Sequence, residues 1–183
     1  AGAGSTGLYW SLVQPEIAKS ARTCVYDRAG YGWSEKSPQP RSVKVMVNEL
    51  HSLLSNVGVA GPYVLVGHSL GGVIVRQYAQ SYPQDVVGMV LVDSAQENQF
   101  QRFPKEIVAA TNKGLEQSRR LELLIATGLP ALNPAQMPLE SKLPIAAAET
   151  YRALVLANPN HLATARGEIA ALERGDTPPV TTL

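Results

Sequence analysis

Gly67-His68-Ser69-Leu70-Gly71 is the stretch of sequence that decides both the fold and the chemistry. It has the pattern G-x-S-x-G, and it lies directly between a compact apolar run, residues 63–66, and the helical pattern of residues 73–82. A serine between a strand and a helix is the setting of a nucleophile elbow, a tight turn that exposes the serine hydroxyl. We expect side chains at Gly67 or Gly71 to collide with such a turn. A glycine-rich turn without chemistry is the alternative interpretation.

The flanking sequence alternates between predicted strands and predicted helices. Residues 22–27 predict a strand, and residues 63–66 predict a strand that is buried on both faces. Ser42 caps a helix that ends at Gly58, and residues 87–92 predict the next strand. This alternation is typical of a parallel sheet with crossover helices, so the sequence predicts an α/β fold.

The pattern changes at about Asn98. From there to residue 173 the sequence is helical, is interrupted by glycines and prolines, and contains no convincing strand. We therefore predict three parts: an α/β core in residues 1–97, a helical lid in residues 98–174, and the start of a further core strand in residues 175–183.

The composition excludes several classes of protein. With 183 residues, of which 45% are hydrophobic, the chain can bury a core of ordinary size. Its formal charge of +1 comes without a basic cluster, so we expect no nucleic-acid partner. A single cysteine, Cys24, excludes an internal disulfide and a cysteine-based zinc site. We predict no cofactor and no metal, and we find no apolar run that is long enough to span a membrane. Localisation and oligomeric state stay open.

Four motifs together resemble the α/β-hydrolase superfamily. The resemblance covers about residues 1–97 and is closest to serine esterases, because dehalogenases and epoxide hydrolases of this superfamily carry Asp where this chain has Ser69. The motifs are similar, in chain order, to the loop after the third strand (Ala1-Gly2-Ala3-Gly4-Ser5-Thr6), the turn after the fourth (Asp27-Arg28-Ala29-Gly30-Tyr31-Gly32-Trp33-Ser34), the serine elbow (Gly67-His68-Ser69-Leu70-Gly71-Gly72) and the end of the sixth strand (Val90-Leu91-Val92-Asp93-Ser94).

The resemblance implies roles for particular residues. Ser69 is then the nucleophile, and the backbone amides of Leu70 and Ala3 form the oxyanion hole. In this fold the catalytic acid follows the seventh strand and the histidine follows the eighth. The chain begins after the third strand and stops inside the seventh, so it looks like an internal excerpt of a longer hydrolase, without the first strands and without the part that bears the acid and the histidine.

Two residues within the chain are alternative candidates for the missing roles. Asp93 ends a strand at the correct edge of the sheet and could be the acid; its other interpretation is a residue that is bonded to loop amides. His161 could be the base, but it begins a helix, where the helix dipole disfavours a protonated imidazole. His51 is expected at the surface and His68 beside the turn. We therefore expect the base to be absent from this chain.

The sequence thus predicts a serine hydrolase that cleaves small-molecule carboxylic esters through an acyl-enzyme on Ser69. The helical lid would set the size and polarity of the substrate. Two alternatives stay open. The first is a catalytically inactive hydrolase fold that binds a ligand or a partner. The second is other chemistry on the same elbow, namely amide, thioester, lactone or carbon–carbon cleavage, or perhydrolysis.

Overall fold

A computed structural model describes residues 1–137 and 139–175, which fall into two compact units. The sheet unit comprises residues 1–3, 38–108 and, among the described residues, 167–175. The helical unit comprises residues 4–37 and 109–166. The bounds of these two units differ from those of the predicted core and the predicted lid. The division into core and lid stays a prediction. Of the strand expected at 175–183, only Gly175 is described, and the rest lies outside the described residues.

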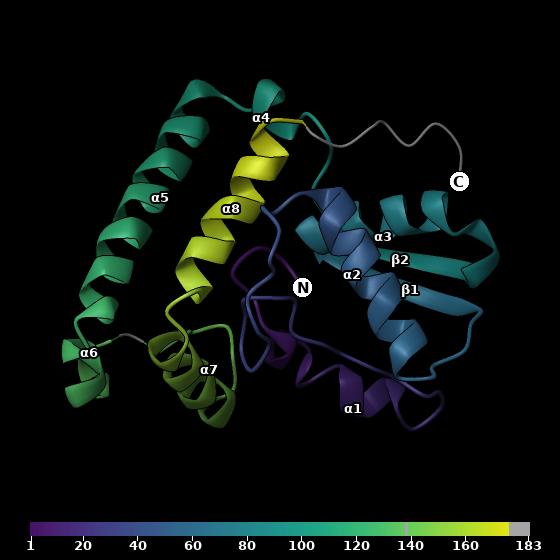
Figure 1. Ribbon diagram of the computed structural model, residues 1–183, viewed down its shortest axis with the longest axis horizontal. Coiled ribbons are helices and arrows are strands. Elements are labelled where there is room, and N and C mark those ends of the chain that lie inside the picture. The colour runs from purple at the N-terminus through teal and green to yellow at the C-terminus, as the bar shows by residue number, and fades with distance from the viewer. Residues whose placement is uncertain (138, 176–183) are drawn as a thin grey trace. The chain divides into compact units, whose positions relative to one another are not determined.

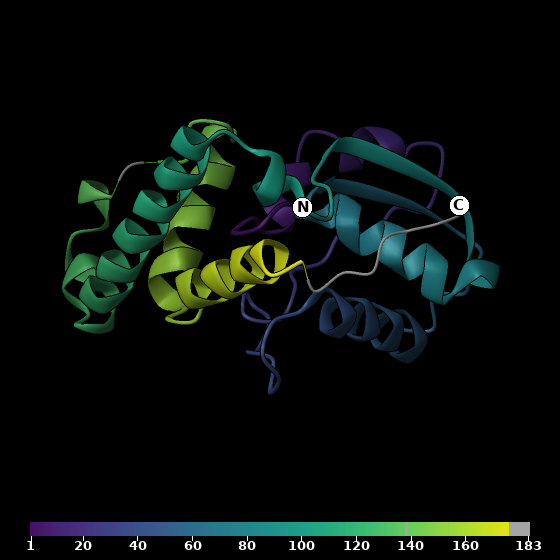
Figure 2. The same ribbon diagram turned by 90° about the horizontal axis from the view of Figure 1, so that it is seen from above.

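The sheet unit is built on two parallel strands that a helix connects. In the register, Tyr63 pairs with Val86 at one end and Ser69 with Ser94 at the other. The connecting helix α3 contacts both strands, and α2 packs against α3 (Figures 1 and 2). The predicted parallel crossover is therefore confirmed. The elements are α2 (Val43–Asn56), β1 (Tyr63–Ser69), α3 (Leu70–Ser81), η2 (Pro83–Asp85), β2 (Val86–Ser94) and α4 (Gln99–Arg102).

The core of the sheet unit lies where α2 meets α3. As predicted, Ser42 caps α2, because its side chain accepts a 3.2 Å hydrogen bond from the backbone amide of Val45. The apolar positions of α2 then recur on one face, which meets the apolar face of α3. The buried core consists of Val43, Met46, Val47, Leu50, Leu70, Val73, Ile74, Tyr78, Ala95 and Leu172.

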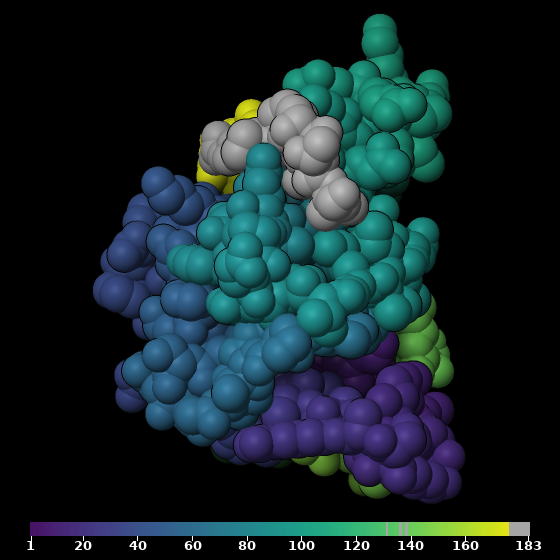
Figure 3. Space-filling view, turned by 90° about the vertical axis from the view of Figure 1, so that its right-hand side faces the viewer, coloured from purple at the N-terminus to yellow at the C-terminus, as the bar shows by residue number. Residues whose placement is uncertain are grey.

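The prediction that residues 63–66 form a strand buried on both faces is wrong. Tyr63 and Leu65 pack against the core, but Val64 is 61% exposed and Val66 is 40% exposed. Side chains alternate between the two faces of a strand, and in the described part of the sheet unit the helices cover only one face. Figure 3 shows residues of β2 and α3, in teal, at the surface beside α2 in blue.

The helical unit confirms the helical reading of the second half of the chain. Across the described residues from 99 to 175 the chain forms helices and turns and no strand. The first residues of α5 and the last turns of α8 belong to the sheet unit. The elements are η1 (Gly7–Trp10), α1 (Gln14–Ile17), α5 (Lys105–Ala126), α6 (Leu129–Leu132), η3 (Pro134–Gln136), α7 (Ile145–Ala157) and α8 (His161–Glu173).

Residues 22–27, which were expected to form a strand, form none. A strand exists through the hydrogen bonds of its ladder, and among the described residues this segment pairs with no other strand. Asp27 instead organises the glycine-rich turn that follows it. Its Oδ1 accepts a 2.7 Å bond from the amide of Gly7, and its backbone carbonyl accepts a 2.7 Å bond from the hydroxyl of Ser34.

Candidate active site

Ser69 occupies a strained backbone position between β1 and α3. Its φ is 52° and its ψ is −124°, a conformation that residues other than glycine rarely adopt. Such a residue costs about 1–3 kcal/mol and persists only where its surroundings impose it. One such constraint is the backbone carbonyl of Ser69, which accepts a 3.0 Å bond from the amide of Ala95. This geometry is the sharp strand-to-helix turn that the sequence predicted.

The glycines around Ser69 are required for space, as the sequence predicted. A Cβ atom on Gly67 would lie 2.6 Å from the carbonyl carbon of Gly71 and 2.7 Å from the Cα of Gly72. A Cβ on Gly71 would lie 2.9 Å from the carbonyl oxygen of Ala1. A Cβ on Gly72 would lie 2.5 Å from the Cβ of Ser94. The elbow therefore packs against its own helix, against residue 1 and against the end of β2.

The segment of residues 1–3 lies beside the elbow within the sheet unit. A Cβ placed on Gly2 would be 3.2 Å from the Cβ of Ser69 and 3.5 Å from its Oγ. Ala3 is partly buried against the core. On the other side of the serine, Leu70 is the first residue of α3, so its amide is one of those that have no acceptor within the helix. Both segments expected to supply oxyanion-hole amides therefore adjoin Ser69.

Ser69 and Asp93 line the same cleft, which has a volume of about 430 Å³. Asp93 is exposed to solvent, and it also has a positive φ, of 41°. The structure thus brings together the predicted nucleophile and the alternative acid at the carboxyl ends of the two strands. The other lining residues are Ser94, Ala95, Gln96, Gln99, Arg102 and Phe103.

Sequence reasoning missed Arg76, a charged residue in the apolar helix α3. Its side chain is only 10% exposed, and its guanidinium reaches the segment that follows Asp93. One signal was available in the sequence: Arg76 follows the apolar run Val73-Ile74-Val75 in a helix that must pack against the sheet. A charge in such a position is retained only with partners, which the sequence alone does not identify.

The chain has three histidines, of which His51 and His68 lie in the sheet unit. The Nδ1 of His51 lies 3.2 Å from the hydroxyl of Tyr78 and 3.6 Å from Oδ2 of Asp85. Asp85 immediately precedes β2, so this group lies at the amino ends of the strands, opposite the edge with Ser69. Burial, with the charge of Asp85, raises the pKa of Tyr78. His68 precedes Ser69 on β1.

His161 belongs to the helical unit, where its side chain takes part in a buried group around Gly4. It is 1% exposed, and its Nε2 lies 3.0 Å from the carbonyl oxygen of Gly4 and 3.3 Å from the hydroxyl of Tyr151. Tyr151 also donates a 2.7 Å bond to the same carbonyl, and the amide of Gly4 donates a 3.0 Å bond to the hydroxyl of Tyr31. His161 therefore contributes to holding Gly4 within its own unit.

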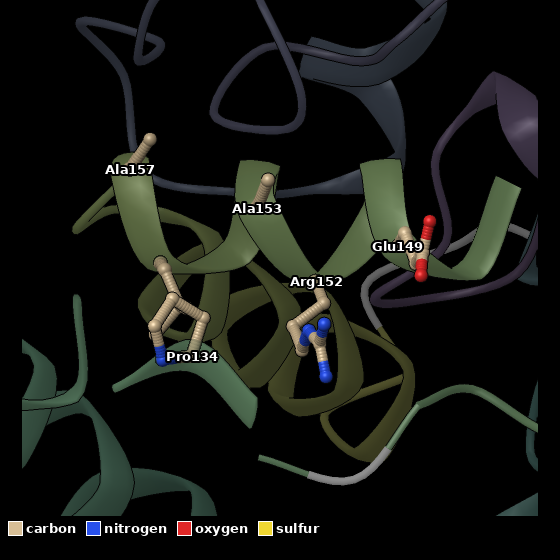
Figure 4. A pocket seen from close by; sticks show the side chains of 6 residues that line it. Pro134, Glu149, Arg152, Ala153 and Ala157 are labelled. Carbon is tan, nitrogen blue, oxygen red and sulfur yellow. The ribbon is translucent and has the colours of Figure 1, made fainter. Parts of the chain in front are cut away.

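A second cavity, of about 270 Å³, lies in the helical unit and carries no comparable chemistry (Figure 4). Two charged residues, Glu149 and Arg152, accompany apolar residues that include Pro134 and Leu156 in its lining. Across the described residues no cluster of histidine, cysteine and carboxylate side chains could hold a metal ion. Nor does any described helix combine the length and apolar character that crossing a membrane requires.

Comparison with known proteins identifies several relatives of this chain. Residues 1–119 match the family model of the alpha/beta hydrolase fold. An AB hydrolase superfamily protein of Gibberella zeae is 36% identical over 132 residues, which are 70% of this chain and 39% of that protein. A hydrolase from Pseudomonas aeruginosa PA01 aligns with a TM-score of 0.63 at 23% identity over 96% of this chain and 62% of the other. A thermophilic esterase from Thermogutta terrifontis aligns with a TM-score of 0.59 at 24% identity over 94% and 60%.

The chain spans less than two thirds of the length of each of these three proteins. The family model nevertheless covers more than half of the chain, from the segment beside Ser69 through both strands and the elbow. The two solved structures share the fold over 96% and 94% of this chain. The chain therefore belongs to the alpha/beta hydrolase fold family.

Proposed function

We propose that this chain carries the nucleophile of a serine hydrolase that cleaves carboxylic esters. The observation that carries the proposal is Ser69, held in a strained conformation at the end of β1 and lining a cleft with Asp93. Strained residues gather at functional sites, because a protein without need of the strain can relieve it by substitution. The likeness to the esterase of Thermogutta terrifontis agrees with ester substrates.

In the proposed reaction the Oγ of Ser69 attacks the ester carbonyl carbon. A base takes the hydroxyl proton, the bond from carbon to the alcohol oxygen breaks, and the alcohol leaves with that proton. Water then attacks the acyl-enzyme by the same route and releases the acid. The amides of Leu70 and Ala3 are proposed to donate to the carbonyl oxygen as it gains negative charge, which lowers the barrier more than it stabilises the bound ester.

The acid and the base of the reaction are also proposals, and the positions of Asp93 and of the histidines support them. Asp93 is proposed as the acid that orients the base, because it lines the cleft of Ser69. The base is proposed to be a histidine outside these 183 residues, because His51 lies at the opposite edge of the sheet and His161 is engaged with Gly4. The helical lid predicted for residues 98–174 is proposed to admit a small to medium apolar acyl group.

A substrate panel tests the proposed reaction. The full-length gene product that contains this chain is assayed on nitrophenyl esters of increasing acyl length, beside the matching anilide, thioester, lactone and peracid-forming reactions. We expect turnover of the esters with the highest kcat/KM for short or medium acyl chains. If another substrate class gives a higher kcat/KM than the esters, the proposed ester cleavage is wrong and that reaction takes its place. A folded protein that turns over none of the substrates would favour the inactive, ligand-binding alternative.

His161→Gln tests the alternative base. Glutamine retains a hydrogen-bond donor for the carbonyl of Gly4 but cannot act as a base. We expect kcat/KM for the best ester to fall less than about tenfold, since removal of a positioning contact costs far less than removal of a catalytic base. A fall of about 10⁴-fold or more, with the folded state retained, would assign the base to His161 and contradict the proposal of an external histidine.

A further inference from the structure

Arg76 is a buried cation of α3 that binds the last residue of β2 and the segment directly after it. Its Nη1 donates a 2.6 Å hydrogen bond to the hydroxyl of Ser94. Its Nη2 donates 2.9 Å bonds to the carbonyl of Ala95 and to Oε1 of Glu97. The planar guanidinium presents several donors in a fixed geometry, which suits the simultaneous binding of three acceptors.

Two of the three acceptors of Arg76 belong to the wall of the cleft that contains Ser69. Ser94 and Ala95 line this cleft directly after Asp93. The amide of Ala95 in turn donates a 3.0 Å bond to the carbonyl of Ser69. Arg76, on the helix that follows the nucleophile, therefore fixes the segment that contains the proposed acid. The same segment, through the amide of Ala95, binds the backbone of Ser69.

The backbone is strained in both segments that this contact joins, so both need such support. Asp93 has a φ of 41° and Ser69 has a φ of 52°. Each conformation relaxes unless neighbouring contacts impose it. Ser94 is also packed so tightly on α3 that a Cβ on Gly72 would lie 2.5 Å from the Cβ of Ser94. The hydrogen bonds of Arg76 and this close packing act on the same residue.

We propose that Arg76 is a positioning residue of the active site, which holds the segment from Asp93 to Glu97 in register with the elbow of Ser69. The proposal rests on the function proposed above. Arg76 touches neither the substrate nor the reacting atoms; it acts through Ser94 and Ala95 on the carboxylate of Asp93 and on the backbone of Ser69. Glu97 supplies the counter-charge that a buried guanidinium requires.

The test compares Arg76→Met with Arg76→Lys and with Arg41→Met. Arg41 is a similarly buried arginine of the sheet unit that does not line the cleft, and its Nη1 donates 2.9 Å hydrogen bonds to both carboxylate oxygens of Glu49. Its loss therefore reproduces the removal of a buried arginine from its carboxylate partner. We expect Arg76→Met to lower kcat for the best ester about 100-fold with KM within about threefold, because a misplacement of about 1 Å costs this much. Arg76→Lys should recover part of the loss, and Arg41→Met should retain kcat.

Equal kcat values for Arg76→Met and Arg41→Met, at the same folded fraction, would overturn the proposal. Amide hydrogen exchange at Ala95 provides a readout that needs no activity: it should become faster in Arg76→Met and stay slow in Arg41→Met. Slow exchange at Ala95 in Arg76→Met would overturn the positioning role even if Ser69 proved not to be a nucleophile. If Arg76→Met does not fold, Ser94→Ala removes one acceptor without leaving a charge unpaired and should lower kcat about threefold to tenfold; an unchanged kcat would contradict the proposal.

Discussion

Ser69→Ala is expected to lower kcat/KM for ester hydrolysis about 10⁶-fold, down to the rate that binding and the oxyanion hole alone support. Alanine lacks the hydroxyl that forms the acyl-enzyme, and the hydroxyl of Ser94, which also lines the cleft, is held by Arg76 and by the carbonyl of Ala95. The fold should tolerate the change, because alanine can occupy the same volume and meets the same backbone strain as serine. Steady-state kinetics on the best ester and a urea titration measure the two effects.

The matched control for this variant is Ser52→Ala, a change of an exposed serine on α2 that does not line the cleft. It should leave kcat/KM unchanged. Retention of more than about one hundredth of wild-type activity by Ser69→Ala would show that another residue is the nucleophile, since loss of a true nucleophile costs far more.

Gly67→Ala is expected to lower the free energy of unfolding by about 3 kcal/mol or more. The added methyl group would lie 2.6 Å from the carbonyl carbon of Gly71 and 2.7 Å from the Cα of Gly72, and both are backbone atoms of the helix that packs on the sheet. A flexible side chain could move away from such a contact, but here the start of α3 must shift, and the elbow conformation of Ser69 shifts with it. Urea denaturation followed by circular dichroism measures the loss.

Gly88→Ala is the control for this prediction, because Gly88 also lies on a strand of the same small sheet. A Cβ at Gly88 would meet only the methyl groups of Val64, at 3.6 Å and 3.8 Å, which is ordinary van der Waals contact. We expect the unfolding free energy of Gly88→Ala to stay within about 1 kcal/mol of wild type. Equal destabilisation by the two variants would mean that general strand effects, not the elbow, determine the requirement for Gly67.

The elements that the sequence predicted correctly have local signals. The cap at Ser42 and the spacing of apolar residues define α2 without reference to the rest of the chain. The elbow is also local, since Gly67, Gly71 and Gly72 clear the space that the strained serine and its helix require. Helix and turn signals of this kind depend on residues a few positions apart, so one sequence contains all of the information.

The features that the sequence did not predict depend on distant partners. Residues 22–27 have the composition of a strand, yet a strand is stable only when another strand supplies its ladder. Val64 and Val66 read as buried because they are apolar, but their burial depends on what covers the second face of the sheet. In the sequence Arg76 is only a charged residue in an apolar helix. Its partners Ser94, Ala95 and Glu97 become apparent only in the folded structure. In each case the missing information is a tertiary contact.

Ser69 is proposed to be an activated nucleophile, and intact-mass analysis after treatment with a fluorophosphonate shows whether its hydroxyl reacts. The full-length gene product that contains this chain is compared with its Ser69→Ala and Ser52→Ala variants. We expect one phosphonyl group per molecule in the wild type and in Ser52→Ala, and none in Ser69→Ala, because only a serine with a working base reacts at an appreciable rate. A folded wild-type protein that stays unlabelled, or a Ser69→Ala variant that labels as completely as the wild type, would contradict it.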